Sequence, residues 1–121
     1  MPAATTVTAT IAAGQSLSAG VDCSAGQIIR LLTPPEWTGA NLTFQLSSDG
    51  TTFGDLVDLY GREVMIAVVP GSMLMLGDYT QFFKGTSFVK LRSGSRDFPV
   101  AQEQARSFVI TLDTAPASVI T

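Results

Sequence analysis

The sequence predicts an all-β fold, an antiparallel β-sandwich or jelly roll of about eight strands in a single domain. Short runs with a period of two recur along the chain, and Gly and Pro residues separate them at intervals of roughly 8 to 12 residues. No segment has the pattern of an amphipathic helix of two turns or more. The sandwich is expected over residues 5–114, between an N-terminal arm (1–4) and a C-terminal tail (115–121).

The first strand is expected in TTVTATI, residues 5–11, where apolar and Thr residues alternate. QIIRLLT and NLTFQLS follow, and the two prolines of PPEW separate them. Asp49-Gly50 then supplies the turn of a β-hairpin. The remaining strands are expected in residues 55–60, 62–69, 72–76, 87–93 and 106–113, with a short helical turn or an irregular loop in 77–85.

Charged residues make up only 14% of the 121 residues, against roughly 25% in a typical soluble domain. We expect both that Ser and Thr coat the surface and that other subunits cover part of it. A net charge of -3 argues against nucleic acid as a partner, because binding a phosphate backbone needs clustered Lys and Arg. The N-terminus resembles neither an export signal nor a membrane span, so we expect synthesis in the cytoplasm.

Several kinds of catalytic and cofactor site are excluded by composition. The chain contains no histidine, which removes the commonest general base and the commonest transition-metal ligand. None of its glycines has the spacing of a phosphate-binding loop. The lone Cys23 is expected to be a small buried apolar residue. We therefore predict a protein that is not an enzyme and that has no cofactor or metal.

The segment EVMIAVVPGSMLML, residues 63–76, breaks the alternation because it is apolar on both faces. Either a loop of the same chain or a neighbouring subunit must cover such a strand. The apolar end of the tail could likewise lie on a neighbour or add a strand to it. The candidate interface residues are apolar side chains of this segment and of the tail: Val64, Met65, Ile66, Val69, Met73, Met75, Val119 and Ile120.

Asp55 and Asp58 form a close pair of carboxylates in a predicted strand. Positions three apart point to opposite faces of a strand, so these groups are poorly placed as an acid and base pair. They are expected to be polar edge or turn residues, and a weak calcium site with Asp49 is a remote alternative. Lys90 and Arg92 share one strand face, which is solvated, holds a carboxylate of DLVDLYG across the sheet, or meets an acidic surface of a partner.

Three aromatic residues suggest an alternative role in sugar binding. Trp37, Tyr60 and Tyr79 could form a platform on which the apolar face of a sugar stacks. For Trp37 we favour a different place, as a plug in the core or at the end of the sandwich, because a large aromatic side chain contributes much apolar burial.

A turn with Ser48, Asp49, Gly50, Thr51 and Phe53 is followed by a strand with Phe88, Lys90 and Arg92. With this motif, residues 28–112 resemble small β-rich virion proteins of tailed bacteriophages, and also discoidin-like jelly rolls. Discoidin-like domains bind glycans or lipids through loops, but no such binding residue matches in this chain. The motif consists of turn and core residues, so it indicates a fold more strongly than an activity.

The phage resemblance implies a head decoration (cement) protein of the virion. Its partners would be the major capsid protein and further copies of itself. The alternative is a carbohydrate-binding jelly-roll module of a tail fibre or baseplate.

Overall fold

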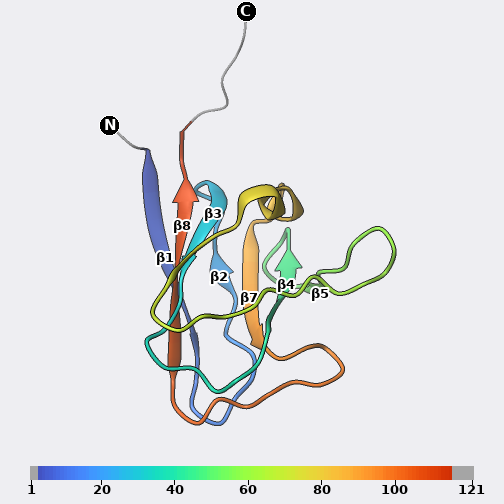
Figure 1. The fold of residues 1–121 in the computed structure, drawn as a ribbon. Coiled ribbons are helices and arrows are strands. Elements are labelled where there is room, and N and C mark those ends of the chain that lie inside the picture. Colours follow the sequence, from blue (N-terminus) through green and yellow to red (C-terminus); the bar gives the residue numbers. More distant parts are fainter. Residues whose placement is uncertain (1–2, 116–121) are drawn as a thin grey trace, which may run out of the picture.

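The computed structural model describes residues 3–115 and contains two antiparallel sheets packed face to face (Figure 1). Each sheet has four strands. Sheet 1 has the order β1-β8-β3-β6, and sheet 2 has the order β2-β7-β4-β5. The strands are β1 (Ala4–Ile11), β2 (Val21–Asp22), β3 (Gln27–Leu32), β4 (Leu42–Ser47), β5 (Gly54–Asp55), β6 (Met73–Met75), β7 (Phe88–Ser93) and β8 (Arg106–Asp113).

This strand order is that of a jelly roll. Each strand of the first half of the chain lies beside its counterpart from the second half, so that β1 pairs with β8, β2 with β7, β3 with β6 and β4 with β5. The chain therefore forms one long hairpin that is wound so that its strands alternate between the two sheets. The predicted all-β sandwich is confirmed.

The core lies between the sheets and follows from the period of two. In β8, Phe108, Ile110 and Leu112 are fully buried, while the residues between them face outward or are half-buried. Trp37 packs edge-on against Phe108, with ring centroids 5.2 Å apart. The ring of Phe83 meets Phe44 in the same way. Trp37 is thus a plug beside the core, as we favoured.

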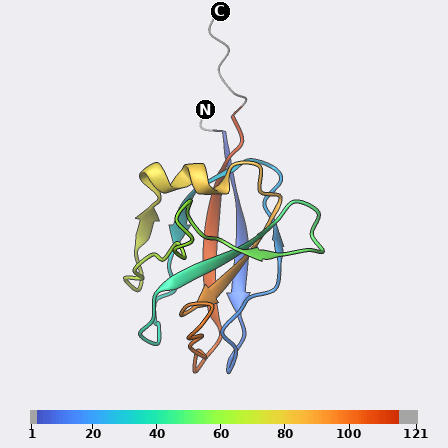
Figure 2. The same cartoon turned by 90° about the vertical axis from the view of Figure 1, so that its right-hand side faces the viewer.

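A 3-10 helix, η1 (Gly77–Phe83), lies across one end of the sandwich, as Figure 2 shows. The sequence predicted either a short helical turn or an irregular loop for residues 77–85, and the structure has the helical turn. The two ends of the described chain lie at this end too, where Thr114 N–H donates to the carbonyl of Ala3 over 2.8 Å. Within residues 3–115, no helix is long and apolar enough to cross a membrane.

Two predicted strands were wrong. Residues 55–60 contain only the last residue of β5, and residues 62–69 contain no strand. One isolated bridge joins Val57 to Glu63, and another joins Leu42 to Ile66. The reason is a turn at 58–62: the backbone bends back on itself at Gly61, whose φ of +78° suits glycine. The short strand β2 was not predicted, because two residues are too few to show a period.

Cys23 is completely buried, as expected for a small apolar residue. Burial, with a smaller contribution from the charge of Asp22, raises the pKa of its thiol to about 11. The group is therefore protonated at neutral pH, and a thiol of this kind is a poor nucleophile.

Candidate functional site

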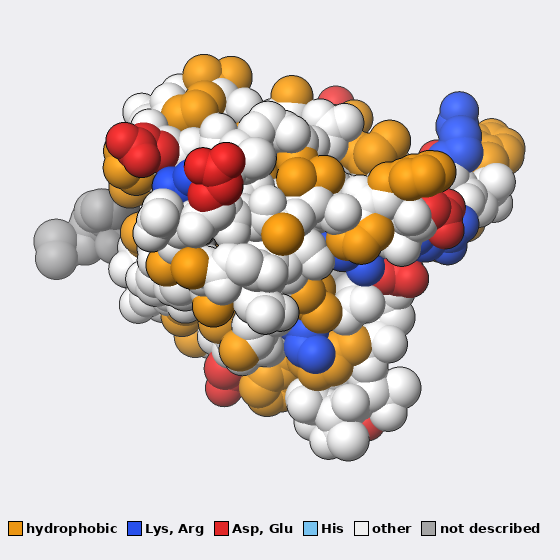
Figure 3. Space-filling view, turned by 90° about the horizontal axis from the view of Figure 1, so that it is seen from below, with side chains coloured by type: hydrophobic (Ala, Val, Ile, Leu, Met, Phe, Trp, Pro, Cys, Tyr) orange, Lys and Arg blue, Asp and Glu red, His pale blue; other side chains and the backbone are white. Residues whose placement is uncertain are grey.

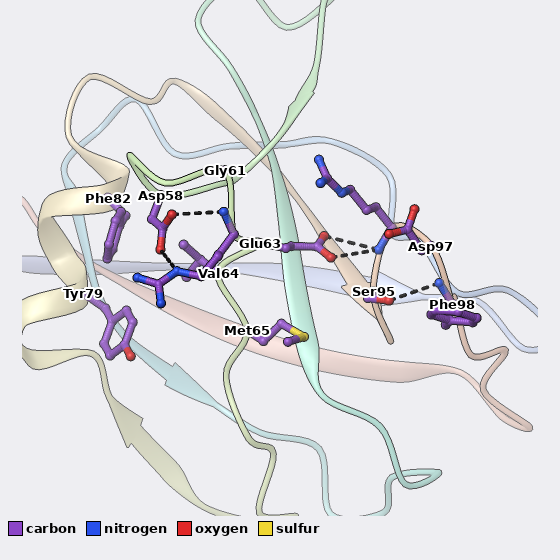
Figure 4. A pocket seen from close by; sticks show the side chains of 12 residues that line it. Asp58, Gly61, Glu63, Val64, Met65, Tyr79, Phe82, Ser95, Asp97 and Phe98 are labelled. Carbon is purple, nitrogen blue, oxygen red and sulfur yellow. Dashed lines mark hydrogen bonds and ion pairs between the residues drawn. The ribbon is translucent and has the colours of Figure 1, made fainter.

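An open hollow of about 790 Å³ lies between three segments that are distant in sequence (Figure 4). Tyr79 and Phe82 project into it from η1 on one side, and Ser95 and Phe98 of the 94–98 loop lie on the other. Met65 lies between them. The remaining lining residues come from the 58–64 segment and the 94–98 loop: Asp58, Gly61, Arg62, Glu63, Val64, Arg96 and Asp97.

A second, smaller hollow of about 190 Å³ adjoins the first and is apolar. Met65 and Tyr79 line both hollows, and Met75 of the edge strand β6 joins them in the second. Met73 points to the same side as Met75, because residues two apart in a strand share a face. Leu32 is the cross-strand partner of Met73. We call Leu32, Met65, Met73, Met75 and Tyr79 the methionine surface.

The side chains of the methionine surface are exposed by 39% (Leu32), 50% (Met65), 52% (Met73), 60% (Met75) and 47% (Tyr79). Val69 and Phe98 are also exposed, Phe98 at the rim of the larger hollow. Exposed apolar side chains gathered in this way mark interaction sites on soluble proteins, and the exposed Arg30, the cross-strand partner of Met75, adds one positive charge beside them. Figure 3 shows hydrophobic side chains spread over one face of the molecule among uncharged ones, with acidic and basic groups at several places between them.

The structure separates the predicted interface residues into two groups. Met65, Val69, Met73 and Met75 are exposed. Val64 and Ile66 are buried in the core, where the backbone of Ile66 bonds to that of Leu42 in both directions. They are therefore core residues that leave little area exposed for a partner. Val119 and Ile120 lie outside the described residues.

The three predicted sugar-stacking residues do not line one hollow. Trp37 is packed on Phe108, and its Nε1–H donates to the carbonyl of Ala40 over 2.9 Å. Tyr60 is exposed in the 58–62 turn, with the guanidinium of Arg62 over its ring. Tyr79 lies beside Phe82, in a hollow that contains neither of the other two.

Arg92 is not on a solvated strand face, which corrects one of our three expectations. Its side chain is only 8% exposed, although it points away from the core. Nη1 donates to Asp55 Oδ1 over 2.8 Å, Nη2 donates to Glu63 Oε2, and Nε donates to Thr43 Oγ1 over 3.0 Å. The second expectation, a carboxylate of DLVDLYG held across the sheet, is confirmed for Asp55.

Glu63 was missed as a partner of Arg92, because it lies in a segment that we took for a strand. Its carboxylate also accepts from the backbone N–H of Arg96, with 3.0 Å between N and Oε1 (Figure 4). Glu63 thereby joins the 58–64 segment to the 94–98 loop across the larger hollow. Gly94, at the start of that loop, has a φ of +87°, and a Cβ there would meet Val100 N at 2.8 Å. Only glycine fits this position.

Asp58 and Asp55 act separately, as predicted, but the reason is the 58–62 turn and not opposite faces of one strand. Asp58 Oδ1 accepts from the backbone N–H groups of Tyr60 and Arg62, and Oδ2 accepts from Arg62 Nε over 3.1 Å. The pKa of Asp58 is held below its ordinary value, first by the backbone hydrogen bond from Arg62. The hydrogen bonds of this carboxylate stabilise the 58–62 turn.

Asp49 has the same kind of local role in the predicted hairpin turn. Its Oδ1 accepts from the backbone N–H groups of Thr51 and Thr52 and from the hydroxyl of Ser47. These bonds, with that from Thr52 the largest, lower the pKa of Asp49. Within residues 3–115, no group of three or more Cys, Asp or Glu residues is placed to hold a metal ion.

Comparison with protein families, with curated proteins and with solved structures finds no match for this chain. The identification of the fold as a jelly roll therefore rests on its strand order.

Arg92→Met should lower the free energy of unfolding by about 3–5 kcal/mol, because Glu63 is left as a buried charge without its partner. Lys90→Met, two positions along the same strand face, should change it by less than about 1 kcal/mol. Lys90 only covers the ring of Phe53 at 4.4 Å. Urea unfolding of both variants measures the difference. Similar losses for the two would contradict a structural role specific to Arg92.

Asp55 should make folding stability depend on pH in acid. Its hydrogen bond to Arg92 is the largest cause that holds its pKa below the ordinary 3.8. The unfolded chain therefore binds this proton more readily, and the stabilisation is present above pH 3.8 and lost as pH falls toward the folded pKa. Asp55→Asn should flatten this part of a urea-unfolding series against pH. An unchanged pH dependence in Asp55→Asn would contradict this role of the Asp55 carboxylate.

Proposed function

We propose that this chain is a non-enzymatic structural protein of a phage particle, a decoration (cement) protein that binds the shell formed by the major capsid protein. The observation that carries the proposal is the methionine surface. Five neighbouring apolar side chains are left exposed on a protein with few charges, and such a surface gains free energy when a partner covers it. The sequence resemblance to virion proteins supplies the kind of partner.

The physical properties of the surface suit repeated contact with a shell. Methionine side chains are flexible and polarisable, so they adapt to the irregular surface between neighbouring capsid subunits. Each contact stabilises only the assembled shell, because it binds that state and not the free subunits. Many weak contacts on one particle add their effects, so no single contact needs to be strong.

The carboxylates support a non-enzymatic role. Asp49 and Asp58 hold turns, and Asp55 and Glu63 bind Arg92. Each of these groups has a structural partner that explains its position. Asp58 and Glu63 line the larger hollow, but hydrogen bonds to Arg62, Arg92 and the backbone of Arg96 hold their carboxylates, whereas a general acid or base needs a proton that is free to move.

Tyr79 favours the second candidate function, a carbohydrate-binding module of a tail fibre or baseplate. Its ring is 47% exposed at a hollow whose other lining groups include the guanidinium of Arg62. A sugar could stack on the ring and hydrogen-bond to the charged groups. Trp37 does not contribute to this sugar site, because its ring is packed against Phe108.

Quantitative mass spectrometry of purified phage particles tests the proposal and separates the two functions. A decoration protein should be present at a ratio near one copy per major capsid protein, because it repeats with the shell lattice. A few copies per hundred capsid proteins would place the chain on the tail and favour the second candidate. Its absence from particles would contradict both.

The double variant Met65→Asp/Met75→Asp should weaken binding to purified shells by at least about tenfold, because docking would bury carboxylates without partners. Leu59→Asp is the matched control and should bind like the wild type. Leu59 is fully exposed but lies outside the methionine surface. Cosedimentation with shells gives the affinities, and thermal unfolding checks that each variant folds. Unchanged binding by the double variant would exclude the methionine surface as the contact.

A further inference from the structure

The four edges of the two sheets are protected to very different degrees. β2 and β5 have two residues each, and β6 has three. Very short edge strands offer little backbone for unwanted pairing. β1, the remaining edge, has eight residues. Figure 1 shows it along the outer flank of sheet 1.

β1 also lacks the other features that protect an edge strand. Its sequence, ATTVTATI, contains no charged residue and no proline. Its pairing with β8 runs from Ala4 to Ile11 without a bulge. All of its residues except the two alanines are β-branched, which favours an extended strand. A long, regular and uncharged edge of this kind is a template for another strand.

The register shows which backbone groups face the free edge. Thr114 N–H donates to the carbonyl of Ala3, so Ala3 and Thr114 form a hydrogen-bonded pair. Hydrogen-bonded and non-hydrogen-bonded pairs alternate along an antiparallel ladder. Ala4, Thr6, Thr8 and Thr10 therefore direct their N–H and C=O groups away from β8. Within residues 3–115, no backbone partner outside the ladder bonds to these groups.

We propose that β1 pairs antiparallel with β1 of a second copy, which joins two copies of sheet 1 into one continuous sheet across a two-fold axis. Pairing Thr6 with Thr8 of the partner subunit, and Ala4 with Thr10 of the partner subunit, satisfies every outward-facing group. Each such pair exchanges two N–H···O bonds. The threonine side chains of these pairs lie on one face and interact favourably.

The absence of charged residues from β1 favours a second copy of this chain as the partner at its free edge. In a two-fold contact each residue faces a residue of the same segment, so any charge in β1 would stand near a like charge. Residues 4–11 contain none. A partner with a different sequence would place no such restriction on β1.

This inference goes beyond the proposed function and does not rest on it. β6, which carries Met73 and Met75, is the opposite edge of the same sheet. Pairing through β1 leaves the methionine surface free, so dimerisation is measurable with the purified chain alone.

Sedimentation equilibrium of the purified chain across about 1 µM to 1 mM tests the proposal. The wild type should approach twice the 12.7 kDa mass of one chain. Thr6→Lys/Thr8→Lys should raise the dimer dissociation constant by at least about tenfold, because each lysine would stand opposite a lysine of the other copy. Both threonines are exposed, so the variant should fold.

The matched control is Ser107→Lys/Thr111→Lys, which adds the same charge on the neighbouring strand β8. In the dimer the two β8 strands are three strand spacings apart, roughly 14 Å. This distance exceeds the Debye length at physiological salt, so the control should still dimerise. Met75→Lys is a second control, and it too should leave the dimer intact.

Amide hydrogen exchange locates the contact in the unmodified chain. The N–H groups of Thr6, Thr8 and Thr10 should exchange slowly at high concentration and quickly on dilution, since only the second copy bonds to them. A single-chain mass throughout the concentration range would overturn the proposal. So would a dimer in which these amides stay unprotected, or one that Met75→Lys disrupts and the β1 lysines do not.

Discussion

The irregular part of this protein depends on one buried guanidinium group. Arg92, in β7, binds two carboxylates. One is Asp55 at the end of β5, and the other is Glu63, which follows the 58–62 turn. Glu63 in turn accepts from the backbone of the 94–98 loop. One side chain therefore fixes two long connections against the outer face of sheet 2. Such a cluster is stable because Thr43 and the backbone satisfy the remaining donors and acceptors, so that no charge is buried alone.

The position of these connections decides which apolar side chains stay exposed. The bridge from Leu42 to Ile66 directs Val64 and Ile66 into the core, and their neighbour Met65 outward. Met65 then lies beside Met75 and Tyr79, which come from an edge strand and from η1. The methionine surface is thus assembled from segments that only the tertiary structure brings together. Met65 stays exposed because the ion pair between Glu63 and Arg92 fixes the backbone of its segment. The segment therefore cannot rotate to bury the side chains of both of its faces.

The two edges of sheet 1 divide the outside of the molecule into surfaces with different physical character. At β6 the backbone edge is short and the side chains are apolar, so a partner there would be recognised by packing. At β1 the side chains are mostly small and polar and the backbone edge is long, so a partner there would be recognised by main-chain hydrogen bonds. A protein that uses both kinds of contact can bind a partner and its own copies at the same time.

The sequence by itself determined the sandwich, because the period of two is a local property of each strand and Phe44 or Phe108 can be assigned to the core from its neighbours alone. It also determined that Asp49-Gly50 forms a turn, whereas Asp55 and Asp58 are separated by a turn at 58–62 and not, as predicted, by opposite faces of one strand. Only the tertiary structure decided that Val64 and Ile66 are core residues, that Arg92 is buried, and that Glu63 is its partner. A segment apolar on both faces fits a covered strand or an anchored loop equally well, and the contacts that distinguish them join residues nearly thirty positions apart, from Glu63 to Arg92. No local pattern encodes a pairing over that separation, so the surface that such pairing creates had to be found in the fold.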